Sequence, residues 1–153
     1  MSSVTIPIEF ELTPRSRAIM DAIHKAISPQ FKAEDQPATH PVDLQPGEHY
    51  AGVVLDEACH VKHHLVLMAP RAEELTWQAA IDWAKEQGGS LPTRQEQALL
   101  YANCKPHLRP VWHWSCEEHE DDASFAWRCD FLSGSQYGFH ESYVGSAVAV
   151  RRV

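Results

Sequence analysis

The sequence predicts an α+β fold in which two helices pack on small antiparallel sheets. Residues 76–103 repeat apolar side chains at the three- and four-residue spacing of helices. On both sides of this region, apolar and polar side chains alternate as they do in half-buried strands. Because 44% of the 153 residues are hydrophobic, the chain can bury one core, and we expect one main domain with an appendage.

The first 30 residues predict a strand followed by a helix. Apolar and polar side chains alternate over Val4–Leu12, where Pro7 has no N–H to donate and favours an edge strand. Thr13-Pro14 is typical of a helix start. The apolar residues that follow share one helical face: Ile19, Ile23, Ala26 and Ile27.

The next segment, residues 31–47, contains repeated proline and little periodicity, which is typical of a linker. The predicted organisation is therefore a strand–helix element at 1–30, a linker at 31–47 and a main domain at 48–153. The N-terminal element would serve homodimer formation or the docking of a partner.

The main domain begins with two apolar runs, residues 48–55 and 63–68, which predict a β-hairpin. A helix is expected to begin at Thr76 and to end at Gly88-Gly89, since glycine commonly follows the last helical residue. The remaining chain has the signals of one further helix start and of several strands.

Thr93 and Glu96 have the spacing of a capping box, in which each side chain accepts a hydrogen bond from the backbone N–H of the other residue. This predicts a second helix that reaches about Asn103. Alternation in the last strand places Ala147, Ala149 and Arg151 on one side and Val148, Val150 and Arg152 on the other. The strands predicted after residue 110 are 111–115, 124–132, 136–139 and 146–153.

Tryptophans cluster in residues 111–128. Trp112 and Trp114 lie two positions apart, which predicts both rings on one face of a strand. Such rings suit either a core or a shelf for a ligand, because they offer a large contact area at low entropic cost. We expect Trp114 and Trp127 to be core residues, whereas Trp112 and His113 are the more open positions and are candidate contacts.

Between these strands the sequence predicts an acidic loop, Glu117–Asp122. Three interpretations stay open: a solvated loop, a patch for a basic partner, or a cation site. The spacing is not that of a calcium-binding EF-hand loop. The candidate contact residues here are Glu117, Glu118, Glu120, Asp121 and Asp122.

Four cysteines occur without a C-x-x-C pair, and we expect free thiols. Cys116 and Cys129 are the pair best placed to form a disulfide across the acidic loop. Cys59, His60, His63 and His64 resemble a metal site most closely, but a structural zinc site normally has a second ligand pair, which is missing. We therefore predict no metal and no cofactor.

The net charge of −8 argues against direct binding to nucleic acid or to an anionic membrane, since both require clustered Lys and Arg. The chain has no signal sequence and no apolar run that could span a bilayer, so we expect a cytoplasmic protein. No nucleophile elbow, phosphate-binding loop or dinucleotide fingerprint is present, and we expect no enzymatic activity.

Four segments of the main domain together resemble a known family: GGSLPTRQE, WHWSCEE, SFAWRCDF and the terminal AVRR. Over residues 48–153 the chain is similar to prophage and bacterial domains of unknown function, and to the C-terminal domain of collagen-like bacterial adhesins. The resemblance implies a C-type-lectin-like fold, in which the first and last strands of the domain pair. The Glu-Pro-Asn and Trp-Asn-Asp sequences of calcium-dependent sugar binders are missing, which argues against calcium-mediated sugar recognition.

The resemblance also implies that a late aromatic segment lies near the ligand-facing surface, with Tyr137, His140 and Tyr143 as candidate contacts. We thus expect a phage-type protein that binds a protein partner with a basic surface, with inhibition of a host defence complex that binds nucleic acid as one expected role. The alternatives are a virion-associated module for a receptor or glycan, and a cryptic enzyme or metal-binding protein.

Overall fold

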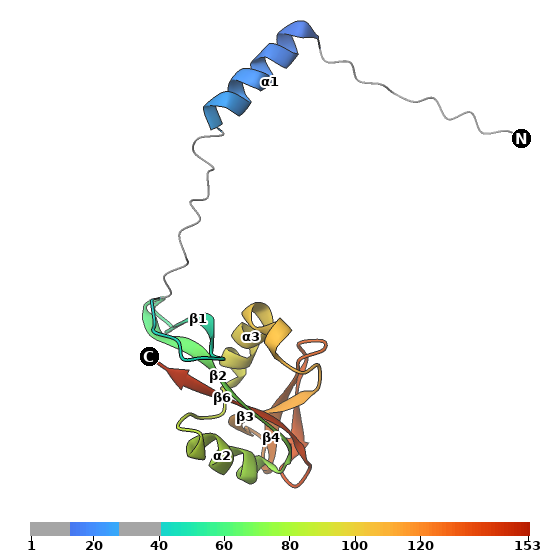
Figure 1. The fold of residues 1–153 in the computed structure, drawn as a ribbon. Coiled ribbons are helices and arrows are strands. Elements are labelled where there is room, and N and C mark those ends of the chain that lie inside the picture. Colours follow the sequence, from blue (N-terminus) through green and yellow to red (C-terminus); the bar gives the residue numbers. More distant parts are fainter. Residues whose placement is uncertain (1–12, 28–40) are drawn as a thin grey trace, which may run out of the picture. The chain divides into compact units, whose positions relative to one another are not determined.

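The structure is a computed structural model that describes residues 13–27 and 41–153 (Figure 1). The chain divides into two compact units, Met1–Thr39 and His40–Val153. Helix α1, Pro14–Ile27, begins as predicted, because the Thr13 Oγ1 accepts a hydrogen bond from the Ser16 N–H at 3.2 Å. Ile19 and Ile23 on its predicted apolar face are 54% and 47% exposed. The strand predicted over residues 4–12 lies outside the described residues.

The second unit contains a six-stranded sheet in the order β1-β2-β6-β3-β4-β5. Neighbouring strands are antiparallel except β6 and β3, whose parallel contact joins Ser146 to His113. The α+β class is therefore confirmed. The elements are β1 His49–Leu55, β2 Val61–Leu75, α2 Trp77–Glu86, α3 Arg94–Asn103, a 3-10 turn Lys105–His107, β3 Trp112–His119, β4 Asp122–Asp130, β5 Gln136–His140 and β6 Gly145–Arg152.

Strand β2 is much longer than the predicted strand at 63–68. Its register against β6 shifts twice, once between Leu67 and Arg71 and again, by one residue, between Ala72 and Leu75. Such shifts interrupt the regular alternation of side chains between the two faces, so the alternating pattern in the sequence ends before the strand does. The last strand pairs with β2 and not with β1, which differs from the pairing that the family resemblance implied.

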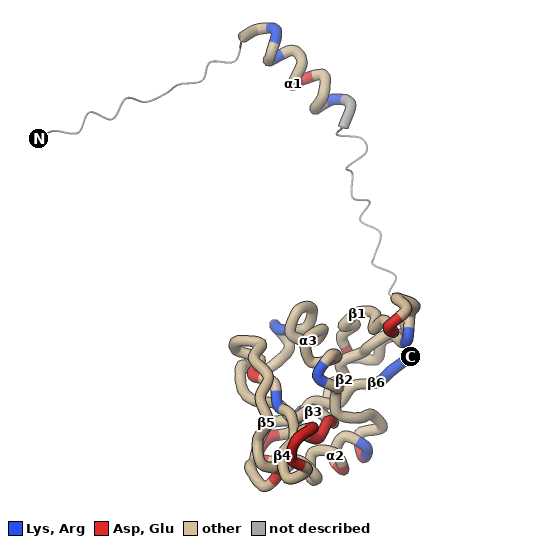
Figure 2. The backbone as a smooth tube through the Cα atoms, turned by 180° about the vertical axis from the view of Figure 1, so that it is seen from behind, with Lys and Arg blue, Asp and Glu red and all other residues tan. Residues whose placement is uncertain are grey.

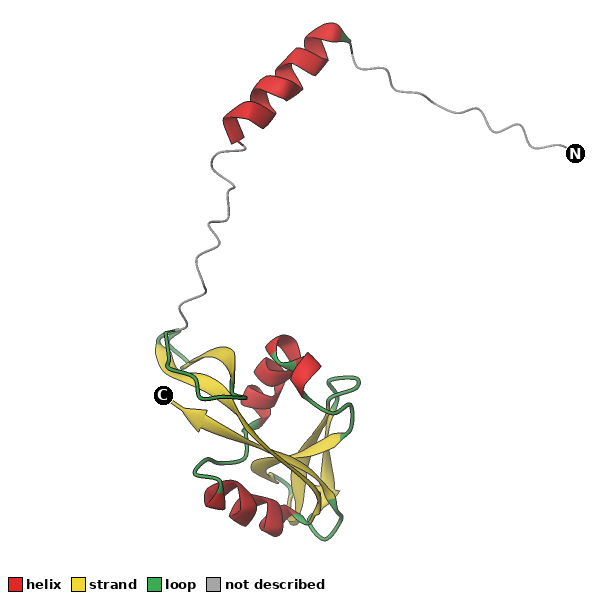
Figure 3. Ribbon diagram, viewed as in Figure 1, coloured by secondary structure: helices red, strands yellow, loops and turns green. Residues whose placement is uncertain are grey.

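Strand β6 separates two apolar clusters, one under each helix. Val148 and Val150 join a cluster with Leu100 of α3, whereas Ala147 and Ala149 join one that contains Trp77 of α2. This confirms the predicted alternation of the last strand. In Figure 3 the two helices lie on opposite sides of the long β2–β6 pair.

Both helix boundaries predicted in this region are confirmed. The Thr93–Glu96 capping box is formed in full at the start of α3. Gly88 follows the end of α2 with φ +79°, a backbone conformation that favours glycine. Thr76 occupies the cap position of α2, but its side chain makes no capping hydrogen bond.

The linker predicted at 31–47 is described only from residue 41. Val42 is buried, and the Asp43 carbonyl accepts a hydrogen bond from the Arg151 Nη2 at 2.6 Å. Arg151 also forms an ion pair with Glu48, with 2.7 Å between Nη2 and Oε2. The described part of this segment is thus fastened to the end of β6.

All four cysteines are free thiols, so the disulfide considered between Cys116 and Cys129 is not formed. Burial raises the pKa of Cys104 and of Cys129 to about 11, whereas Cys59 is exposed. Since the thiolate is the reactive form, the buried thiols combine low access with low nucleophilicity.

We therefore expect Ellman's reagent to modify Cys59 rapidly in the native protein and Cys104 and Cys129 only after unfolding. Absorbance and mass spectrometry of the labelled peptides measure this order. A Cys59→Ser variant should lose the rapid phase. Rapid native labelling of Cys104 or Cys129 would show that the packing described here is wrong.

Candidate functional site

The predicted acidic loop is a tight β-hairpin. Strand β3 continues through His119 and β4 begins at Asp122, so only Glu120 and Asp121 lie outside strands. Figure 2 shows acidic positions in red gathered around this hairpin. The loop prediction was wrong because a run of charged residues is compatible with a strand whose side chains reach solvent or a neighbouring helix.

Two of the five acidic candidates hold the hairpin against α3. The Glu117 carboxylate accepts a hydrogen bond from the Arg94 backbone N–H at the start of the helix, where the dipole favours an anion. Glu120 accepts from the Arg94 Nη1 at 3.1 Å and from the Trp127 Nε1 at 3.0 Å. Glu117 and Glu120 are thus bonded within the chain, and their role as partner contacts stays a prediction.

Trp127 is partly exposed and is not a core residue, contrary to the prediction. The Arg94 guanidinium lies 3.5 Å from the centre of its ring, and His119 stacks on it with centroids 4.8 Å apart. Opposite Trp127 stands Gly138 of β5, where a Cβ would lie 2.6 Å from the His119 Cδ2. Glycine at this position therefore leaves room for the His119 ring.

Next to this stack lies a surface depression, which we call the β4–β5 groove. It consists of two adjoining hollows of about 310 and 620 Å³ that share Phe125 and Gly138. One hollow has acidic walls and the other aromatic walls. The lining residues are His119, Asp121, Asp122, Phe125, Gly138, Phe139, His140, Ser142 and Tyr143.

The acidic end of the groove is held in place locally. Asp122 accepts hydrogen bonds from the Ser124 N–H at 2.9 Å and from its hydroxyl at 2.6 Å, and these bonds, with His140 and His119 nearby, lower the pKa of its carboxyl. His140 in turn shares a hydrogen bond between its Nδ1 and the Ser142 hydroxyl at 2.8 Å. The groove thus holds the ionised carboxylate of Asp122 beside two histidines at neutral pH.

The aromatic end is exposed. Tyr143 is 62% exposed, and Phe125 contacts His140 edge to face, with ring centroids 5.6 Å apart. Strand β5 is the edge of the sheet and pairs only with β4 among the described strands. The groove therefore opens to solvent along a sheet edge, with Asp121, Asp122, His140 and Tyr143 of the predicted contacts in it.

The remaining candidates lie elsewhere. Tyr137 is exposed but points to the other face of the sheet, where its ring meets that of Trp112 at 5.9 Å. Glu118 is exposed in β3, opposite Ala126. His113 is only 2% exposed, which corrects its assignment as a contact: β3 turns its side chain inward against Phe131.

The residues of the metal-like cluster do not converge. His63 shares a hydrogen bond with Glu96 at 2.8 Å, and His64 shares one with the Tyr50 hydroxyl at 2.8 Å. Cys59 and His60 lie in the turn between β1 and β2. Within residues 13–27 and 41–153, no group of three or more His, Cys, Asp or Glu is placed to hold a metal ion.

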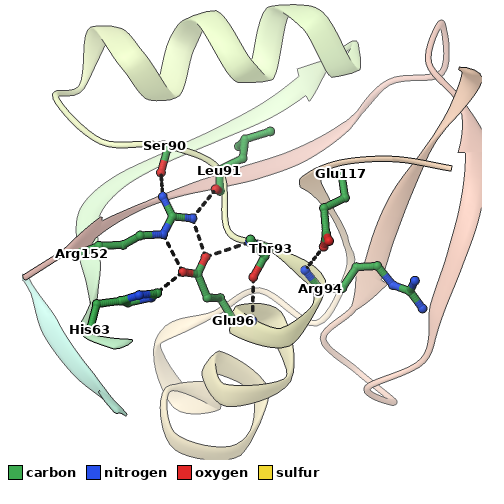
Figure 4. Close-up of polar contacts among 8 residues, drawn as sticks. All are labelled: His63, Ser90, Leu91, Thr93, Arg94, Glu96, Glu117 and Arg152. Carbon is green, nitrogen blue, oxygen red and sulfur yellow. Dashed lines mark hydrogen bonds and ion pairs between the residues drawn. The ribbon is translucent and has the colours of Figure 1, made fainter. Parts of the chain in front are cut away.

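An ion pair that the sequence did not predict joins the buried carboxylate of Glu96 to Arg152, whose side chain is 34% exposed (Figure 4). The Glu96 carboxylate is 1% exposed and accepts from the Arg152 Nε and Nη2, both at 2.6 Å. It also bonds the His63 ring and the Thr93 N–H, each at 2.8 Å. Burial raises the pKa of Glu96, but these hydrogen bonds outweigh burial and lower it.

This ion pair gives a structural reason for two of the quoted segments, TRQE and AVRR. Glu96 is also part of the capping box, so one carboxylate fixes the start of α3, the end of β6 and His63 of β2. Every hydrogen bond that the carboxylate makes is to another residue of the chain, so Glu96 joins three elements of the fold. The spacing of Thr93 and Glu96 predicted the capping box. No pattern in the sequence predicts that Glu96 also pairs with Arg152.

Comparison with protein-family models and with curated proteins found no match for this chain. No helix among the described residues is both long enough and apolar enough to cross a bilayer.

Proposed function

We propose that this chain is a non-catalytic binding module with a C-type-lectin-like fold, which contacts a protein partner through the β4–β5 groove. One observation supports this most: the groove places Asp121 and Asp122 beside the rings of Phe125 and Tyr143 at an exposed sheet edge. Such a surface suits the Lys and Arg side chains of a partner with a basic surface.

The physical basis is that these side chains are amphipathic. Their aliphatic stems and cationic heads pack on aromatic rings, while the charge is complemented by nearby carboxylates. Complementary charge also steers diffusional encounter, and the net charge of −8 extends that attraction beyond the groove. Asp122 is already fixed by Ser124, so little ordering is needed on binding.

The order of elements supports the finer fold assignment. A strand pair is followed by two helices, then by three strands, and a terminal strand joins the two halves of the sheet. The family resemblance of residues 48–153 favours a phage or prophage protein that acts in the host cytoplasm. A host defence complex that binds nucleic acid would offer the basic surface that this groove complements.

A pull-down from host lysate tests the proposal when it is made with matched variants. Asp121→Asn with Asp122→Asn removes two groove carboxylates and keeps their shapes. Glu57→Gln with Glu86→Gln removes the same charge from exposed positions elsewhere. We expect capture of a partner to drop with the first pair and to persist with the second. Equal capture by the wild type and both double variants would show that the groove is not the binding surface.

The alternative function, a virion-associated glycan or receptor module, has distinct expected results. It requires the protein in purified particles and selective signals on a glycan array. Selective binding on the glycan array, together with no host protein captured from lysate, would favour this alternative over the binding of a basic protein partner.

A further inference from the structure

A second site is indicated by Arg128, which is buried without an anionic partner. Its side chain belongs to β4, and the residue is 7% exposed. The Nη2 donates to the Val144 carbonyl at 3.2 Å, whereas the Nε has no hydrogen-bond partner. Among the described residues no carboxylate lies within ion-pair distance of this guanidinium.

The guanidinium lies between aromatic surfaces. Its Cζ is 4.6 Å from the ring centre of Trp114 and 4.7 Å from that of Phe139. Burial lowers the pKa of Arg128, but arginine stays charged in proteins. Buried charges are normally paired, because desolvation is costly without an opposite charge. The rings compensate only part of this cost.

Arg128 forms part of the wall of a hollow of about 220 Å³ on the face of the sheet that carries Trp112. On its rim, Glu73 forms an ion pair with Arg109, so these two charges cancel. The Glu74 side chain has no hydrogen bond or ion pair to another described residue, and the φ of +54° is unusual for a residue other than glycine. The hollow therefore has one uncompensated cation and one uncompensated anion.

Gly145 keeps this arrangement open. A Cβ at this position would lie 2.7 Å from the Arg128 Nη2 and 3.1 Å from the Trp114 Nε1. Any side chain here would push the guanidinium away from its place beside the rings.

We propose that this hollow binds a small zwitterion of the amino-acid class, whose carboxylate contacts Arg128 and whose ammonium group contacts Glu74. Its volume is below the several hundred Å³ typical of sites for larger ligands. Trp112 offers an apolar wall for a short side chain. This inference does not depend on the β4–β5 groove.

The experiment is an NMR titration of the full chain with glycine, with sodium acetate and with sodium chloride at matched ionic strength. The signals to follow are the Arg128 Nε–H and the indole N–H groups of Trp112 and Trp114. We expect saturable shifts with glycine, shifts at roughly tenfold higher concentration with acetate because Glu74 repels a lone carboxylate, and none with chloride.

Two variants complete the test. Arg128→Met keeps an unbranched side chain between the rings and should abolish the saturable shifts. Glu74→Gln changes an exposed residue and should weaken glycine binding while strengthening acetate binding. This variant therefore tests the proposal even if Arg128→Met does not fold. No saturation with glycine, or glycine binding that is unchanged in either folded variant, would overturn the proposal.

Discussion

Replacing Glu96 with alanine is expected to lower the free energy of unfolding by about 2–3 kcal/mol, since hydrogen bonds to a charged group contribute about 1.5–3 kcal/mol and the Arg152 side chain, 34% exposed, can still be solvated. The substitution removes the acceptor of four hydrogen bonds, two from Arg152 and one each from His63 and Thr93. It leaves the Thr93 N–H without its capping partner and Arg152 without its anion. The start of α3 and the end of β6 then lose their common anchor.

Urea unfolding followed by tryptophan fluorescence measures this effect. Glu86→Ala on the exposed face of α2 is the control, and it should change stability by no more than about 0.5 kcal/mol. A loss of less than about 1 kcal/mol for Glu96→Ala would contradict the role given to the ion pair. Since the pKa of Glu96 is lowered in the folded state, its contribution is present above its ordinary value of 4.5 and is lost as pH falls below it.

The second large effect is a loss of stability in mild acid through His113. Burial lowers the pKa of this side chain from 6.5 to about 4, against a hydrogen bond to the Val111 carbonyl that acts in the other direction. The folded state therefore disfavours the protonated ring, and the unfolded state binds the proton first. The neutral His113 ring makes its full contribution to the free energy of unfolding above pH 6.5. This contribution, about 3 kcal/mol, is lost as the pH falls toward 4.

His113→Asn tests this assignment, because an amide can still donate to the Val111 carbonyl at the place of the Nδ1 but does not titrate. We expect the variant to be less stable at neutral pH, owing to lost packing on Phe131, and to show a flatter pH dependence between 6.5 and 4. The difference in slope between the two proteins isolates this residue from other titrating groups. Parallel slopes would place the acid sensitivity elsewhere.

Local patterns predicted much of the fold. The start of α3 and the alternation of β6 depend on residues within one turn or one strand, and both are confirmed. The extent of β2 depends on bulges, which no local pattern marks. The sheet order depends on pairing between distant segments, so the separation of β1 from β6 by β2 could not be predicted.

The candidate site could be predicted less well, since it depends on contacts across the chain. Glu117 and Glu120 look like free acids in the sequence, but both bond Arg94, more than 20 positions away. Trp127 looks like a core residue because of its size, but Arg94 and His119 cover it at the surface. Phe125 and Ser142 complete the groove only because β4 and β5 pair.

We propose that the β4–β5 groove binds a basic partner through Asp121 and Asp122. The most direct test is the affinity of the captured partner, measured as a function of salt for the wild type, the Asp121→Asn/Asp122→Asn variant and the Glu57→Gln/Glu86→Gln control. We expect the groove variant to bind roughly three- to tenfold more weakly, with a flatter salt dependence, and the control to follow the wild type. Equal affinities and equal salt slopes for the groove variant and the wild type would contradict the claim.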